Sequence, residues 1–122
     1  MSDYDIRMDP IAGTLERIDL GPLAQAADHP WFNQTLIQVG AVLVRLGVFE
    51  PGSFHWHSHE EQDEFFLVLT GHLRIELDDR EPAELSAGQA FSVPAALRHR
   101  PVATEPTTVV MIEPAGVRPT GD

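Results

Sequence analysis

Proline and glycine interrupt this sequence so often that a long helix does not fit into most of it. The 122 residues include ten prolines and nine glycines, spread along the chain. Each proline removes a backbone donor, and a glycine weakens a helix interior. The apolar stretches between them are short and rich in β-branched residues, as in 35–49 and 107–112, which favours strands. We therefore predict an all-β chain, long enough for one domain and no second core.

About eight short strands, spaced roughly ten residues apart, are typical of a β-sandwich, jelly roll or small barrel. Residues 35–49 are predicted to form one long or two short strands, because two glycines interrupt them and Pro51 follows. Residues 72–77 alternate between apolar and polar side chains, the pattern of a half-buried strand. The other strands are expected at 64–69, 83–85, 90–93 and 107–112.

The two ends of the chain are expected to add to this domain without forming one of their own. Residues 1–34 mix acids, proline and glycine with short apolar pieces, which predicts an N-terminal arm packing on a barrel of residues 35–113. A short strand near 14–20 and a helical turn around 23–27 are expected within that arm. Residues 114–122, rich in proline and glycine, are predicted to form a tail on the surface.

The charge and the missing residue types exclude several functions. The chain carries 19 acidic residues against 8 basic ones, a formal net charge of −11. Such a surface repels phosphate backbones and anionic lipids, so we expect a small-molecule ligand, not nucleic acid or a membrane. The chain has neither cysteine nor lysine, which excludes thiolate chemistry and lysine Schiff bases. A signal peptide and a spanning segment of about 20 apolar residues are both absent, so a cytoplasmic location is expected.

Three histidines alternate shortly before an apolar strand: His55, His57 and His59. Side chains two apart on a strand point the same way, with Cα atoms about 6.6 Å apart. Two such imidazoles can bind one ion at about 2.1 Å from each ring nitrogen. His55 and His59 would start roughly 13 Å apart, so a straight strand cannot bring all three to one metal. The pattern indicates a metal site that uses one neighbouring pair.

Glu64 has two interpretations. It opens the apolar strand on the same parity as Phe66 and Val68, and a carboxylate in that position is costly to bury unless it is paired or binds a metal. Alternatively, it is only the last acid of the solvated turn formed by residues 60–63.

The spacing of these residues resembles the first motif of the cupins, a superfamily of small jelly-roll barrels. Four residues separate the pair His57 and His59 from Glu64, and six more precede Gly71. The string DEFFLVLTGHLRIEL also resembles short bacterial single-domain cupins, a group that we associate with mannose-6-phosphate isomerase-like cupins.

A second cupin-like motif follows downstream, where five and then four residues separate Gly88, Pro94 and His99. Without this spacing, His99 would be interpreted as a loop histidine between arginines. The match departs from the family at Ala96, where glycine is usual, and at Ala103, where asparagine is usual. Only four residues, not the common five, separate Gly52 from His57. These differences affect the turns more than the ligands.

The resemblance implies an all-β cupin jelly-roll barrel, a homodimer, and one metal ion bound by His57, His59, Glu64 and His99. His55 would then lie beside the ligands or at the rim of the cavity. Three imidazoles and one carboxylate suit Fe, Mn, Ni, Co, Cu or Zn and disfavour Ca or Mg. One or two open positions on the ion would be left for substrate.

From this resemblance we expect a metal-dependent enzyme, an oxygenase or other oxidoreductase, acting on a small metabolite in the barrel lumen. The alternatives are a sugar isomerase or lyase, and a non-catalytic module that binds metal or a small ligand. The candidate catalytic residues besides the ligands are His55 and Arg45. Arg45 is alone in an apolar strand. If it is buried it needs an anionic partner, either Glu113 or a substrate carboxylate; alternatively, it lies at an exposed edge of the sheet. Trp56 alternates with the histidines and should face away from the cavity.

Overall fold

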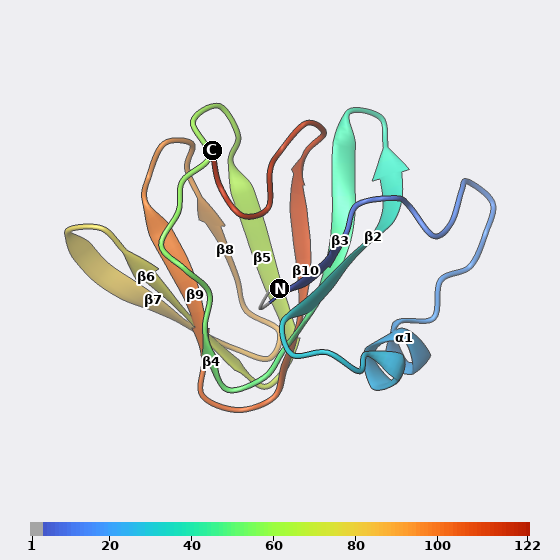
Figure 1. Cartoon of the computed structure of the whole chain (residues 1–122), viewed down its shortest axis with the longest axis horizontal. Coiled ribbons are helices and arrows are strands. Elements are labelled where there is room, and N and C mark those ends of the chain that lie inside the picture. The colour runs from blue at the N-terminus through green and yellow to red at the C-terminus, as the bar shows by residue number, and fades with distance from the viewer. Residues whose placement is uncertain (1–3) are drawn as a thin grey trace.

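Two β-sheets form the walls of the domain in the computed structural model, which describes residues 4–122 (Figure 1). The larger sheet has the order β1-β2-β3-β10-β5-β8, and only β1 and β2 pair in parallel. Its strands are β1 (Asp5–Arg7), β2 (Phe32–Val39), β3 (Val42–Phe49), β10 (Thr107–Pro114), β5 (Glu64–Thr70) and β8 (Ala90–Val93). The smaller, fully antiparallel sheet has the order β4-β9-β6-β7. Its strands are β4 (Gly52–Ser53), β9 (His99–Ala103), β6 (His72–Leu77) and β7 (Arg80–Ser86).

This two-sheet jelly roll confirms the predicted all-β fold class. Residues 35–49 were predicted to form one long or two short strands, and they belong to two strands, β2 and β3. Strand β2 begins three residues earlier than predicted. Val39 pairs with Val42 across a two-residue turn. Gly40 in that turn has a φ of 59°, a conformation that glycine adopts without steric cost.

The hydrophobic core lies between the two sheets. Strand β6 contributes Leu73 and Ile75, which are fully buried while their neighbours on the other face are partly exposed, as the alternation predicted. Phe66 and Val68 of β5 and Val109 of β10 join them in one cluster. Burying a side chain of this size stabilises the fold by roughly 1.5–3 kcal/mol. The interior also holds polar side chains, and these define the site described below.

The N-terminal segment differs from its prediction. The described residues contain no strand at 14–20, because Leu15 has a φ of 67° and an exposed side chain, and neither fits an extended, paired strand. The short strand of this region is β1 instead, and residues 1–3 of the predicted arm lie outside the described range. Helix α1 (Leu20–Ala26) lies close to the predicted helical turn. No helix within residues 4–122 is long and apolar enough to span a membrane.

Two further elements were not expected. Strand β9 begins at His99 and lies between β4 and β6. The C-terminal segment, predicted to lie on the surface, folds back toward the interior: Val117 is only 4% exposed. In Figure 1 this segment, in red, leaves β10 and crosses toward the loop that precedes β5.

Candidate metal centre

The four predicted ligands come from three places in the fold. His57 and His59 lie in the loop between β4 and β5, Glu64 is the first residue of β5, and His99 is the first residue of β9. Paired backbone bonds join the loop to β9: the N–H of His57 donates to the carbonyl of His99 at 3.0 Å, and the reverse bond is 2.9 Å. These bonds position two ligands from distant stretches of the chain beside each other.

A further backbone bond secures the third histidine. The N–H of Ala96 donates to the carbonyl of His59 at 2.8 Å. Ala96 has a φ of 69°, which is a left-handed conformation. This is the position of the second motif at which the family usually has glycine. Alanine adopts it at a cost of about 1–2 kcal/mol, and the turn is kept.

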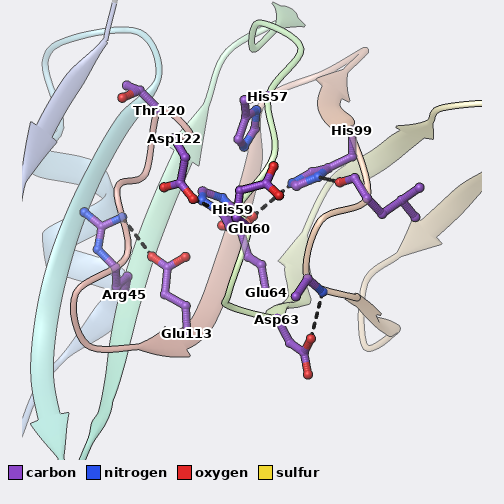
Figure 2. A network of polar contacts seen from close by, with 12 residues as sticks. Arg45, His57, His59, Glu60, Asp63, Glu64, His99, Glu113, Thr120 and Asp122 are labelled. Carbon is purple, nitrogen blue, oxygen red and sulfur yellow. Dashed lines mark hydrogen bonds and ion pairs between the residues drawn. The ribbon is translucent and has the colours of Figure 1, made fainter.

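The structure brings the four side chains together (Figure 2). Each of His57, His59, Glu64 and His99 is buried, and one nitrogen or oxygen from each lies within 4.8 Å of the others. One oxygen of Glu64, Oε1, is 3.1 Å from Nε2 of His99 and 3.3 Å from Nε2 of His59. Two donors on opposite sides of one ion, each about 2.1 Å away, would be about 4.2 Å apart. The cluster therefore has the size of a mononuclear metal site.

Two of the histidines are oriented by backbone carbonyls. Nδ1 of His57 is 2.9 Å from the carbonyl oxygen of His55, and Nδ1 of His99 is 2.8 Å from that of Leu97. A carbonyl only accepts, so each Nδ1 carries a proton, and Nε2 is the nitrogen of each ring that could bind an ion. Such bonds to the second ring nitrogen are the usual way in which proteins orient metal-binding histidines.

His59 is the least satisfied polar group of the cluster. Its side chain is buried, yet neither Nδ1 nor Nε2 has a hydrogen-bond partner among the described residues. A buried polar atom without a partner costs about 1–3 kcal/mol, and such atoms are rare in native proteins. A metal ion bound to one of these nitrogens would account for this cost, so the donor set fits a first-row transition metal.

The electrostatics of the site keep the donors in the forms that bind metal. Burial lowers the pKa of His57 to about 4, and the neighbouring His99 adds to this effect. The imidazole is therefore neutral at pH 7. Burial alone would raise the pKa of Glu64, but the adjacent imidazoles of His59 and His99 outweigh it and hold the pKa well below its usual range. Glu64 is therefore a carboxylate.

The metal-free protein is expected to lose stability as the pH falls from about 6.5 toward 4. The pKa of His57 is 6.5 when unperturbed and about 4 in the folded chain, so the unfolded state binds more protons in this window. The contribution is fully present above pH 6.5 and amounts to roughly 3 kcal/mol, which is lost by the time the pH reaches the folded pKa. Urea denaturation of the chelator-treated protein at several pH values measures it.

His57→Asn is the matched variant for this pH series, because it removes the titrating imidazole and keeps a small polar side chain. The free energy of unfolding of this variant should depend less steeply on pH between 4 and 6.5 than that of the parent. Equal slopes in the two proteins would contradict the assignment of this pH dependence to His57.

Of the two candidate catalytic residues, His55 lies outside the four-residue cluster. Its side chain is exposed, and its imidazole contacts the two ends of the chain: Nδ1 is 3.1 Å from the Tyr4 hydroxyl, and Nε2 is 2.6 Å from the Thr120 carbonyl oxygen. Within residues 4–122, its only hydrogen bond to the cluster is the one that its backbone carbonyl accepts from His57.

Arg45, the other candidate, is buried on the opposite side of Glu64 from His99 (Figure 2). Its Nε donates to Thr35 at 2.9 Å, one Nη donates to Asn33, and the other lies 3.5 Å from Glu113. The partner predicted within the protein is therefore present. Burial and the negative charge of Glu64 raise the pKa of Glu113 to about 9.

A small cavity connects Arg45 with the four-residue cluster. Its polar lining is Asn33, Arg45, His57 and Glu64, and its apolar lining is Phe49, Phe54, Phe66, Pro101, Met111 and Pro119. Asn33 and Pro119 were not singled out from the sequence. Pro119 carried no sequence signal, since a proline in a polar tail has no periodic pattern. Asn33 could have been noticed as an amide at the entrance of an apolar strand.

Trp56 faces away from the cluster, as predicted. The guanidinium groups of Arg98 and Arg100 each lie 5.2 Å from the centre of one of its rings, and Nε of Arg100 is 2.6 Å from Glu76. The outer side of the site is therefore covered by stacked cationic side chains.

The fold and the buried cluster together define a jelly-roll domain with a group of side chains that could bind a metal ion. Residues 45–113 match the family model described as the cupin domain, which is more than half of the chain. The chain belongs to the cupin family.

Relatives agree with this membership. A protein of Bacillus subtilis (strain 168), named uncharacterized protein YdbB, is 40% identical over 68 residues, which are 56% of this chain and 59% of that protein. The chain therefore matches less than two thirds of this relative. A cupin-2 domain containing protein from Shewanella frigidimarina has a similar structure, with a TM-score of 0.73 and 29% identity over 80% of this chain and 93% of its own.

Hydroquinone 1,2-dioxygenase from Sphingomonas sp. TTNP3, solved with 4-hydroxybenzoate bound, has a TM-score of 0.72. It is 20% identical, and the similarity covers 81% of this chain but only 32% of the dioxygenase. At this identity the likeness concerns the fold.

Proposed function

We propose that the chain binds one divalent first-row transition metal ion and acts as an oxygenase or other oxidoreductase on a small metabolite. The observation that carries this proposal is buried His59, whose ring nitrogens have no hydrogen-bond partner among the described residues and which lies beside three other donors. The predicted ligands are His57, His59, Glu64 and His99. When bound, such an ion supplies a Lewis acid with open positions for substrate or dioxygen.

The chain's own residues have separate roles in this proposal. The backbone bonds to Nδ1 of His57 and His99 hold both imidazoles with Nε2 toward the ion. The aromatic and methionine side chains of the cavity exclude water and contact the apolar part of a substrate. Arg45 and Asn33 are the polar groups on the opposite wall, where a substrate carboxylate or hydroxyl would be oriented.

The fold of the dioxygenase neighbour supports the preference for oxygen chemistry, since the same architecture accommodates that reaction. An isomerase or lyase, as in the mannose-6-phosphate isomerase-like group, and a non-catalytic metal-binding module are the other outcomes to be tested. We also retain as proposals a homodimer, a cytoplasmic location, and the division into an arm (1–34), a barrel (35–113) and a tail (114–122).

The test begins with protein purified without chelators and analysed for metal by mass spectrometry. Metal-free protein is then reloaded with each of the six candidate ions, and oxygen uptake is measured with catechols, hydroquinones, thiols and flavonols. We expect one ion per chain and oxygen uptake that depends on the ion. Bound metal without turnover in oxygen or isomerase assays would favour a binding module, and protein that binds none of the six ions would overturn the proposal.

A further inference from the structure

The C-terminal residues 118–122, here named the strap, cover the cavity beside the four-residue cluster. Val117 precedes the strap and is buried among other side chains. Pro119 is one of the residues that line the cavity. At Gly121 the backbone passes so close to the cluster that an added Cβ would lie 2.5 Å from Cβ of His57. The strap is therefore part of the wall around the site.

Hydrogen bonds join the strap to the same loop that carries His57 and His59 (Figure 2). The N–H of Asp122 donates to the carbonyl of Ser58 at 3.0 Å, and the Asp122 carboxylate accepts from the N–H of Glu60 at 2.7 Å. His55 provides the third bond, from Nε2 to the carbonyl of Thr120. A few hydrogen bonds of this kind, each worth about 0.5–1.5 kcal/mol, can open locally while the sheets stay folded.

His55 has a defined function in this arrangement. Its Nε2 must carry the proton, because it faces a carbonyl oxygen, so Nδ1 accepts the hydrogen bond from the Tyr4 hydroxyl. The Tyr4 oxygen in turn accepts the N–H of His55 at 3.0 Å. His55 is thus a positioning residue that holds the strap against the loop and connects it to the N-terminal segment.

The size of the cavity shows that something must move before a substrate can bind. The space open to the centre of a water molecule is about 20 Å³, enough for one or two waters and too little for a metabolite. Apart from His57, which lies in the loop bonded to β9, the other residues that line the cavity belong to paired strands or to the core cluster. The strap belongs to no strand and is held to the loop by the three bonds described above. Gly116 and Gly121, with φ of 94° and 96°, lie on either side of Pro119, where a hinge would be placed.

We infer that the strap is a movable roof over the metal cavity, and that Pro119 determines the size of molecules that reach the metal. This inference rests on the proposed function only where it concerns substrates. The contacts of the strap with His57 and with the backbone on either side of His59 do not require a bound metal, so the two proposals can fail separately.

Gly121→Ala tests the roof, with Gly116→Ala as the matched control. The two glycines have nearly the same φ, so alanine introduces the same backbone strain at both. The new methyl group collides with His57 at residue 121. At residue 116, nothing lies within 4 Å of the new methyl group. A third variant ends after Val117 and lacks the strap altogether, so it removes the roof without a collision at a metal ligand.

The first measurement uses metal-free protein. Diethyl pyrocarbonate modification of His59 is followed by peptide mass spectrometry. We expect His59 to react about tenfold faster in Gly121→Ala and in the shortened variant, because the bonds that hold the strap are lost, while Gly116→Ala reacts like the parent. Equal rates of His59 modification in all four proteins, with the shortened variant folded normally, would overturn the inference.

The second measurement uses cobalt-loaded protein and two probe ligands of different size, azide and imidazole, titrated by visible absorption. Removal of the strap should increase imidazole affinity about tenfold, because no roof then has to open, and should leave azide affinity nearly unchanged. An equal increase for both ligands would contradict size selection by Pro119. If neither cobalt nor any of the other five candidate ions binds, the proposed function fails, while the modification experiment still decides the strap.

Discussion

His59→Ala is expected to abolish stable metal binding, reducing the metal content from one ion per chain to background. His59 is the histidine whose ring nitrogens have no other partner among the described residues, so the substitution removes a donor and leaves the rest of the cluster in place. Changing a residue that only supports a ligand costs 10–100-fold in affinity, and loss of a ligand should cost more than about 100-fold. Metal analysis after dialysis and competition with a coloured chelator measures this loss.

The matched control is His72→Ala. His72 also lies beside a carboxylate, that of Glu84, but outside the cluster and partly exposed to solvent. This variant should bind metal like the parent. If His59→Ala retained a full ion of unchanged affinity, the four-residue site would be wrong, and equal losses in both variants would indicate binding by histidines in general.

Arg45→Met is expected to destabilise the metal-free protein by several kcal/mol, because each buried acceptor left without a partner costs about 1–3 kcal/mol. The guanidinium is 1% exposed and bonds Thr35, Asn33 and Glu113. Methionine fills similar space without the donors, so those acceptors lose their partner inside the domain. Denaturation with guanidinium chloride at pH 7 gives the free energy of unfolding of both proteins.

Arg74→Met is the control for this measurement. Arg74 also forms an ion pair, with Glu76 at 3.2 Å, but its side chain is 44% exposed. Exposed pairs contribute about 0–1 kcal/mol, so this variant should unfold almost like the parent. A loss below about 1 kcal/mol for Arg45→Met would show that the buried network does not stabilise the domain.

Most of the fold could be predicted because local signals and tertiary structure agree. Strand β8 has the predicted bounds, and β6 has the predicted alternation, since each side chain there meets either core or solvent. The elements that were missed depend on long-range pairing. Strand β9 contains His99, Arg100 and Pro101, an unlikely composition for a strand, and it exists because β4 and β6 pair with it on either side.

In the site, too, some features could be predicted from local sequence and others depend on long-range contacts. The spacing of the two motifs was enough to select the residues that the structure brings together, because the backbone pairing of His57 with His99 follows from the order of the strands. The tautomers of the histidines and the network around Arg45 could not be predicted. They depend on which carbonyls and carboxylates lie within hydrogen-bond distance, and that is decided only when both sheets are assembled.

That the C-terminal strap covers the cavity could not be predicted from the sequence, for a further reason. A segment rich in proline and glycine has no periodicity that shows which side will be buried. The contacts of Pro119 and Gly121 are set by a loop about 60 residues earlier in the chain. The turn at Ala96 is similar, since its left-handed backbone could be expected only from the family pattern.

Glu64 belongs to β5 of the larger sheet, and His99 belongs to β9 of the smaller one. An ion shared by these two residues would act as a cross-link between the layers, and separating them would first require its release. Its contribution to folding would then grow with the logarithm of the free ion concentration. Such a chain should resist proteolysis longer in medium that contains the metal ion than in medium depleted of it. The supply of the metal would then determine the lifetime of the protein.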